Sequence, residues 1–201
     1  MKVLVACEFS GIVRDAFSKR GHDSWSCDLL PSESPGQHIQ GDVRQYVRSA
    51  QGWDLMIAFP PCTHLAVSGA RWFPAKQASG EQAAALEFVG WFFQWQGKLA
   101  VENPIGIIST QIKRPTQIIQ PWQFGHPETK ATCLWLQGGL PTLKPTVIVE
   151  GRKARVHHEP PGPDRWKNRS RTYQGIADAM AEQWGACERI ENAQRQVRLF
   201  A

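Results

Sequence analysis

The sequence contains no apolar run long enough to form a membrane-spanning helix. The apolar stretch near its amino terminus, residues 3–7, is also too short for a signal peptide. The five cysteines are an odd number and none belongs to a CxxC pair, which argues against a disulfide framework and against a zinc site. His157 and His158 lack metal-ligand spacing to these cysteines. We therefore expect a cytoplasmic protein with no membrane segment and no bound metal.

Length and composition are those of an ordinary folded chain. With 201 residues, 42% hydrophobic and 20% charged, the sequence is long enough for one domain with a substantial core. Two full domains would not fit, so we expect a single domain over residues 1–201. The net charge of +5 and the pI near 9.1 permit a nucleic-acid or nucleotide partner without requiring one.

Short apolar segments of strand type alternate with segments of helical periodicity. The expected strands are residues 2–7, 23–27, a third one ending near Asp42, 55–59 and 98–101; the expected helices are 12–21, 43–50 and a largely buried helix over 81–95. This alternation predicts an α/β fold of Rossmann-like type, with a single, mostly parallel sheet flanked by helices. The charged tail, residues 188–201, ends in VRLF, which can pair as a last strand.

The stretch WDLMIAFPPC, from Trp53 to Cys62, is the feature around which the rest of the chain is arranged. Its apolar run has the length of a buried strand and stops at Pro60 and Pro61. Ligands of open α/β sheets bind outside the carboxyl ends of the strands, where the two prolines hold the backbone of Cys62. Cys62 is therefore our candidate nucleophile. The alternative is a buried cysteine with only a packing role.

The turn after the first expected strand has the sequence EFSG. Phe9, Ser10 and Gly11 precede a helix, so backbone N–H groups and the helix amino terminus are expected to face a ligand. Asp28 follows the second strand at the position where Rossmann-type sites bind ribose hydroxyls, although an aspartate there is also common simply as the first residue of a loop. Asp42, in the segment GDV, can accept a hydrogen bond from an adenine amino group.

Glu102 lies at the tip of the strand KLAV and begins the segment ENP. This strand is expected to lie beside the one that carries Cys62, which would bring a carboxylate and a thiol into one pocket. Partial burial would raise the pKa of such a carboxyl group towards neutrality and suit it to acid–base chemistry. A carboxylate that caps a helix or forms an ion pair is the alternative.

Two further segments are candidates for substrate contact. Residues 63–80 are too long and irregular for a simple connection, and we expect them to form an active-site lid that includes Ser68 and Arg71. Residues 151–171 form a basic, proline-broken loop with Arg152, Lys153, Arg155, Arg165, Lys167, Arg169 and Arg171. This loop is expected to contact phosphates without reading sequence, with Trp166 stacking on a base. The alternative is a solvated surface loop.

Together these motifs resemble, in type and in order, the cytosine-C5 DNA methyltransferases, and especially their small phage-encoded relatives. FSG is similar to the glycine-rich cofactor loop of that family, WDLMIAFPPC to its catalytic strand with Pro-Cys, and ENP to its Glu-Asn motif. FGHPETKATCLWL, residues 124–136, resembles the Gln-x-Arg-x-Arg segment, and TYQGIADAMAEQWG, residues 172–185, the carboxyl-terminal helix. The resemblance covers most of residues 1–140 and then residues 172–185.

The resemblance implies a reaction, a cofactor and a partner. Cys62 would add to C6 of cytosine, and Glu102 would bind the N3 and amino group while C5 takes a methyl group from S-adenosylmethionine. The resemblance assigns cofactor contacts to Phe9, Ser10, Gly11, Asp28, Asp42 and Pro61, and substrate or nucleic-acid contacts to Asn103, Ser68, Arg71, Lys130, Arg165, Lys167, Arg169 and Arg171. The partner would be DNA with a flipped-out base, in a bacterial host or phage-infected cell.

The sequence also departs from the family pattern. Glu8 stands where the family has a small residue, and we expect it to crowd the methionine end of the cofactor. Glu128, Lys130 and Thr132 replace the Gln-x-Arg-x-Arg residues, which leaves one cation. Only about thirty residues separate Pro145 from the carboxyl-terminal helix, too few for a target-recognition domain. Two alternatives follow: the same chemistry on free pyrimidine nucleotides, or an inactive protein that binds nucleic acid or cofactor.

Overall fold

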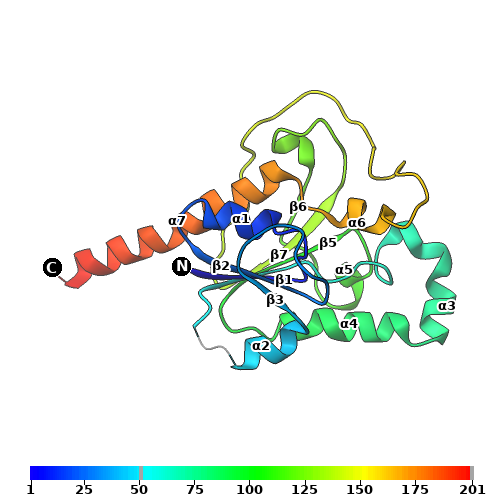
Figure 1. The fold of residues 1–201 in the computed structure, drawn as a ribbon, viewed down its shortest axis with the longest axis horizontal. Coiled ribbons are helices and arrows are strands. Elements are labelled where there is room, and N and C mark those ends of the chain that lie inside the picture. Colours follow the sequence, from blue (N-terminus) through cyan, green and yellow to red (C-terminus); the bar gives the residue numbers. More distant parts are fainter. Residues whose placement is uncertain (50–51, 200–201) are drawn as a thin grey trace.

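The sheet forms where the sequence has its short, apolar, β-branched segments. The computed structural model describes residues 1–49 and 52–199 and shows an α/β fold with one seven-stranded sheet flanked by helices (Figure 1). The strands are β1 (Lys2–Ala6), β2 (Asp23–Asp28), β3 (His38–Gln40), β4 (Leu55–Ala58), β5 (Lys98–Pro104), β6 (Gln117–Ile119) and β7 (Thr132–Gln137).

The strand order is β3-β2-β1-β4-β5-β7-β6. Strands β1 to β5 run parallel, and β7 is antiparallel to both of its neighbours, β5 and β6. The prediction of a single, mostly parallel sheet is therefore confirmed. From β1 the chain builds outward to β2 and β3, and it then returns to place β4 on the other side of β1. The boundary between β1 and β4 is thus the point at which the strand order reverses, where open α/β sheets leave a crevice for ligands.

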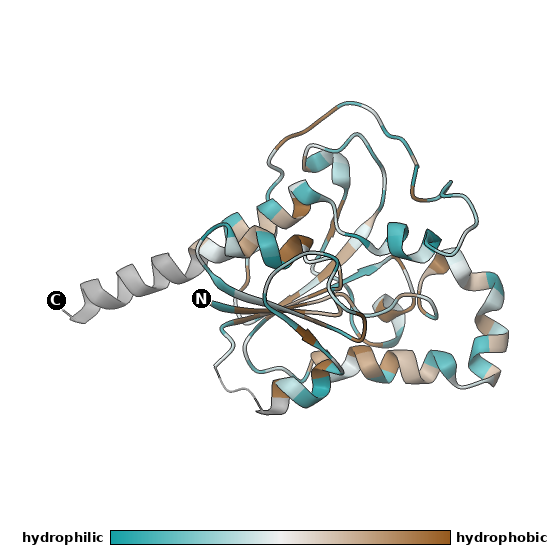
Figure 2. Ribbon diagram, viewed as in Figure 1, coloured by the Kyte–Doolittle hydropathy of each residue, from teal (hydrophilic) through white to brown (hydrophobic). Residues whose placement is uncertain are grey.

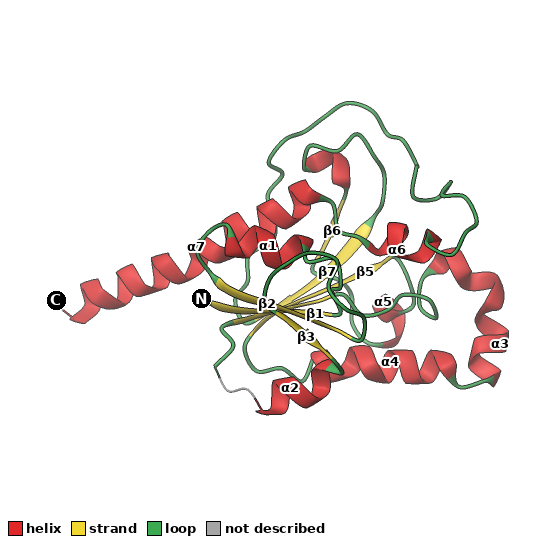
Figure 3. Cartoon of the chain, in the orientation of Figure 1, coloured by secondary structure: helices red, strands yellow, loops and turns green. Residues whose placement is uncertain are grey.

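Helices cover both faces of the sheet (Figure 3). They are α1 (Ile12–Ser18), α2 (Val43–Ser49), η1 (Val67–Trp72), α3 (Phe73–Ala78), α4 (Glu81–Phe92), α5 (Ile108–Gln111), η2 (Pro121–Gln123), α6 (Arg165–Ser170) and α7 (Gln174–Leu199). Helices α1 and α7 pack on one face, and α2, α4 and α5 pack on the other. No helix among the described residues has the length and apolar character needed to cross a membrane.

Alternation along the central strands divides the core into two layers. Val3 and Val5 of β1 pack with α1 and α7, whereas Leu4 and Ala6 face the opposite layer with α4. This is the period of two that a strand imposes on its side chains. Both faces of β1 are apolar because both are covered, as expected for a parallel strand. Figure 2 shows the resulting concentration of hydrophobic residues in the centre of the sheet.

Several sequence-based expectations need correction. The helix expected over 81–95 ends at Phe92, and only one side of it is buried, because its other side faces solvent. Residues 63–80 are not irregular, since most of them form η1 and α3. The terminal strand is also wrong: α7 continues as a helix to Leu199, and residues 50, 51, 200 and 201 lie outside the described part of the chain.

Candidate functional site

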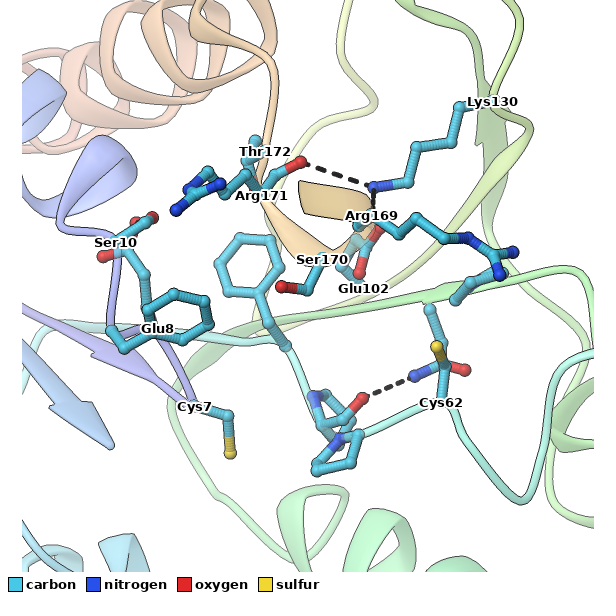
Figure 4. Close-up of a pocket in the computed structure, with 16 residues that line it drawn as sticks. Cys7, Glu8, Ser10, Cys62, Glu102, Lys130, Arg169, Ser170, Arg171 and Thr172 are labelled. Atoms are coloured by element: carbon cyan, nitrogen blue, oxygen red, sulfur yellow. Dashed lines mark hydrogen bonds between the residues drawn. The ribbon is translucent and has the colours of Figure 1, made fainter. Parts of the chain in front are cut away.

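The carboxyl ends of three neighbouring strands surround a pocket at the reversal point of the sheet. Residues 7–10 after β1, residues 59–62 after β4 and residues 102–104 at the end of β5 line it, and Lys130 and residues 169–172 complete the wall (Figure 4). Cys62 and Glu102 therefore face the same pocket as Phe9 and Ser10. Their convergence follows from parallel strand pairing, because strands that run in the same direction end at the same edge.

The turn that carries Cys62 is held by the neighbouring strand. The side-chain Nδ2 of Asn103 donates a hydrogen bond of 2.8 Å to the carbonyl oxygen of Pro60. Asn103 has no exposed surface, and β5 extends past the end of β4 to bring its side chain under the turn. The Oδ1 atom of Asn103 is buried and has no hydrogen-bond partner among the described residues. A buried acceptor without a partner beside a pocket is available to a ligand donor.

Burial makes the thiolate of Cys62 unfavourable. The pKa of Cys62 is raised, first by burial and then by the negative charge of Glu102. Lys130 and Arg169 act in the opposite direction and lower it. Since the thiolate is the nucleophilic form, these two cations are the groups that favour reactivity of this cysteine.

Glu102 also favours its protonated form. Its pKa is raised by burial, while the charge of Lys130 and a hydrogen bond from the Thr132 side chain work against this shift. Glu102 pairs across the sheet with Leu134 of β7, so its position is set by the antiparallel ladder rather than by a loop. A protonated carboxyl group in a pocket can donate a hydrogen bond to a ring nitrogen of a ligand.

Lys130 connects the pocket wall to the basic segment. Its Nζ atom donates hydrogen bonds to the backbone carbonyls of Arg169, at 2.8 Å, and of Arg171, at 3.4 Å. These carbonyls lie at the carboxyl end of α6, where helix carbonyls lack partners of their own and attract cations. Lys130, which we expected to contact substrate, therefore also binds the carboxyl end of α6. No sequence pattern pairs residue 130 with residues 169 and 171.

The turn after β1 differs from the expected anion-binding turn. The carboxylate of Glu8 accepts hydrogen bonds from the backbone N–H groups of Val13, at 2.6 Å, and Arg14, at 3.2 Å. The prediction that the amino terminus of α1 offers these N–H groups to a ligand is wrong, because a buried side chain already occupies them. Burial raises the pKa of Glu8 to about 7, against the effect of these two backbone bonds and of the Arg14 charge.

Gly11 shapes this turn without lining the pocket. It adopts a φ of 75°, and a Cβ atom there would lie 2.2 Å from the Ser34 hydroxyl and 2.4 Å from Nη2 of Arg14. Glycine is therefore required by both conformation and space. Phe9 and Ser10 do line the pocket, as expected.

The two aspartates expected to bind the cofactor lie outside the pocket wall. Asp28 accepts a hydrogen bond of 2.9 Å from the backbone N–H of Leu30, which is the geometry of a loop-starting aspartate. Asp42 forms an ion pair of 2.6 Å with Arg44. Burial raises the pKa of the Cys7 thiol, and the negative charges of Asp28 and Asp42 raise it further. Asp28 and Asp42 are therefore grouped on the Cys7 side of the pocket.

A buried arginine that the sequence analysis missed supports this side of the site. Arg14 of α1 has no exposed surface. Its guanidinium donates hydrogen bonds to the hydroxyls of Ser26, Ser32 and Ser34 and to the carbonyls of Ser34 and Pro35. Ser34 in turn donates to the carbonyl of Ser10 at 3.3 Å. Because an arginine on a short helix is normally exposed, nothing in the sequence indicated that Arg14 is buried.

Other candidate residues lie apart from the pocket wall. Ser68 and Arg71 of η1 are exposed, and Arg71 packs over the ring of Trp72 at 4.9 Å. No residue of the segment 63–80 lines the pocket. Residues 169–172 of the basic segment do line it, so this segment forms a wall where the sequence predicted only a loop.

No known family model and no curated protein matches the chain. Among the described residues no group of three or more histidine, cysteine, aspartate or glutamate side chains is arranged to hold a metal ion.

Proposed function

We propose that the protein transfers a methyl group from S-adenosylmethionine to C5 of cytosine, in DNA and with little sequence specificity. The observation that carries this proposal is the convergence of Cys62 and Glu102 on one pocket at the point where the strand order reverses. Nucleophilic attack at C6 of a pyrimidine requires two groups, a thiol and a carboxyl group with a raised pKa. The order of the motifs in the sequence supports the same assignment.

The residues present are compatible with the proposed cofactor. Phe9 and Ser10 would hold it on the β1 side of the pocket, with Asp28 and Asp42 beyond Cys7 for its nucleoside part. Glu8 places a carboxyl group at this end, which suits an ammonium or sulfonium cation rather than a carboxylate. The cofactor, when bound, supplies an electrophilic methyl group.

The protein's own groups would perform the remaining steps. The Cys62 thiolate forms a bond to C6 of the ring, and the electron pair displaced from the C5–C6 bond makes C5 nucleophilic. Glu102, in its protonated form, donates a hydrogen bond to N3 and stabilises the charge that develops there. After C5 has gained the methyl group, solvent water takes the C5 proton, and the electron pair of that C–H bond re-forms the C5–C6 double bond as the Cys62 thiolate leaves C6.

A duplex base cannot reach a pocket at the edge of a sheet, so a DNA substrate must present its cytosine flipped out or in a single strand. The chain lacks room for a recognition domain, and the pocket wall at residues 169–172 carries two arginines, Arg169 and Arg171. Phosphate contacts of this kind give affinity without sequence readout.

One observation favours the alternative of an inactive binding protein. Glu8 fills the amino terminus of α1, which closes an anion-binding position that such a turn would otherwise offer. Binding without transfer would then be the expected behaviour. Cys62 and Glu102 have no function in that alternative, and we therefore favour the enzyme.

The test is transfer of labelled methyl from S-adenosylmethionine to single-stranded DNA, duplex DNA and dCMP, with the label located on the base. We expect label at cytosine C5 of DNA, and no label with Cys62→Ala. DNA that contains 5-fluorocytosine should form a covalent adduct with the wild-type protein, because fluorine at C5 cannot leave as a cation. Transfer to dCMP alone would establish the nucleotide alternative. No transfer by protein shown to be folded would refute the enzyme.

A further inference from the structure

The basic residues in and after α6 do not have equivalent surroundings. Three of these four residues contact other groups of the chain. Arg165 donates from Nε to the carbonyl of Glu159 at 2.7 Å, Lys167 lies 5.7 Å from the ring centroid of Trp166, and Arg171 forms an ion pair of 2.8 Å with Glu33. Each of these three cations therefore has a partner within the chain.

Arg169 is the exception. Its guanidinium makes no hydrogen bond and no ion pair within the part of the chain that the structure describes, and it lines the pocket together with Cys62 and Glu102. Figure 4 shows its side chain extending from α6 towards the side of the pocket on which Cys62 lies. An unpaired, half-buried cation directed at a pocket is available to a negative group there.

The backbone of Arg169 is fixed in place. Lys130 binds the carbonyl of Arg169, and the Arg171–Glu33 ion pair holds the next turn of chain. On the other side, the ring of Trp166 packs against that of Phe9, with centroids 5.7 Å apart. Contacts on both sides of the pocket thus hold α6, and with it the backbone of Arg169, in a fixed position.

A positive charge near Cys62 would favour its thiolate form. Burial and Glu102 both disfavour a negative sulfur atom at Cys62. Lys130 lowers the pKa of Cys62, but its amine is shared with two carbonyl groups at the end of α6. A second cation in the pocket wall favours the thiolate further.

We propose that Arg169, supplied by the basic segment, acts together with Lys130 to stabilise the thiolate form of Cys62. Lys130 also orients α6, since it binds the carbonyl of Arg169. This role rests on the proposed function, because a stabilised thiolate matters only to a nucleophile. It gives the segment 151–171 a part in catalysis beyond contact with phosphates.

The experiment measures the thiolate directly and needs neither cofactor nor DNA. Folded protein is treated with iodoacetamide over a range of pH, and modification of Cys62 is followed by mass spectrometry of the peptide that contains it. We expect Arg169→Gln to slow alkylation of Cys62 at pH 7 by about three- to tenfold and to shift its pH profile upward. Arg169→Lys, which keeps the charge, should recover most of the rate.

Arg114→Gln is the matched control, since it removes an exposed arginine that does not line the pocket. It should leave the alkylation profile unchanged. Equal profiles for wild type and Arg169→Gln would overturn the proposal, as would equal slowing by Arg114→Gln, which would indicate a general effect of net charge. A slowed profile in a protein that shows no methyl transfer would support the role of Arg169 and refute the proposed function instead.

Discussion

The carboxylate of Glu8 lies 2.6 Å from the backbone nitrogen of Val13 and closes the amino terminus of α1 from inside the pocket. Burial raises its pKa to about 7, while the neighbouring Arg14 lowers it and Asp15 raises it. The folded state therefore holds a proton that the unfolded chain, with the ordinary value of 4.5, has already lost. Between these two values the free energy of unfolding falls as pH rises, because a buried charge has to form in the folded state.

Glu8→Gln should remove this pH dependence. Below pH 4.5 the carboxyl group is neutral in both states and the variant resembles the wild type. Above pH 7 the wild type bears the full cost of the charge, so the variant gains up to about 3 kcal/mol relative to it. Urea unfolding at pH 5 and pH 8 measures the difference. Exposed Glu182→Gln is the control, and a constant difference between Glu8→Gln and wild type at both pH values would contradict the shift.

Glu102→Gln should change two properties of Cys62 in opposite directions. The substitution removes the ionised fraction of the Glu102 carboxyl group, whose charge disfavours the thiolate, so alkylation of Cys62 by iodoacetamide should become faster. Methyl transfer should fall by about a hundredfold or more, because an amide is a much weaker acid than a carboxyl group and stabilises the charge at N3 less. Alkylation rates and transfer rates are measured on the same preparation.

Glu87→Gln, on α4 and away from the pocket, serves as the control and should alter neither rate. Unchanged alkylation in Glu102→Gln would show that its carboxylate does not act on Cys62, and slower alkylation would contradict the direction of its effect. Unchanged methyl transfer would remove Glu102 from the reaction.

Asn103→Ala should destabilise the fold through the turn that carries Cys62. The carbonyl of Pro60 loses its 2.8 Å hydrogen bond in a buried setting, which costs about 1–3 kcal/mol in the free energy of unfolding. Chemical denaturation measures this loss. Asn168→Ala, which removes two exposed hydrogen bonds, to Glu159 and from Arg171, should cost less than about 0.5 kcal/mol. Equal costs for the two variants would show that the Asn103–Pro60 bond contributes no more than a surface contact.

The part of the site that contains Cys62 and Glu102 could be predicted from the sequence because its signals are local. The apolar run Leu55–Phe59 marks a strand, the two prolines mark its end, and Cys62 follows directly. Parallel pairing then places Glu102 beside it, since β5 is the neighbour of β4. Each of these steps depends on a few adjacent residues and on a general rule of α/β sheets.

The rest of the site depends on contacts between segments far apart in the chain. Lys130 meets α6 across about forty residues, and Arg14 reaches the loop around Ser34; neither partner is marked by spacing. Glu8 lines the pocket, and its carboxylate also binds the N–H groups at the start of α1, a contact that its place in the sequence did not indicate. The segment VRLF has strand propensity, but it follows a long run of good helix formers, and α7 continues to Leu199.

Arg14→Met should be strongly destabilising although its volume is nearly kept. The side chain is fully buried and bonds two backbone carbonyls and three serine hydroxyls, which would lose their partner together. We expect a loss of about 3 kcal/mol or more in the free energy of unfolding, with faster proteolysis of residues 29–37. Arg20→Met, which breaks a half-exposed ion pair with Asp178, should cost less than about 1 kcal/mol. Similar costs for the two would contradict the organising role of Arg14.

The ion pair between Glu33 and Arg171 joins the loop after β2 to the end of α6, and it should show measurable coupling in a double-mutant cycle. Both side chains are about one-third exposed, so solvent screens the pair, but its geometry is bidentate. We expect a coupling energy of about 0.5–1 kcal/mol between Glu33→Gln and Arg171→Gln at low salt, decreasing at 1 M salt. Because Asn168 also bonds Arg171, only the cycle isolates the pair. Additive effects at low salt would mean that the pair does not help to hold α6, whose position would then depend on contacts such as those of Lys130 and Trp166.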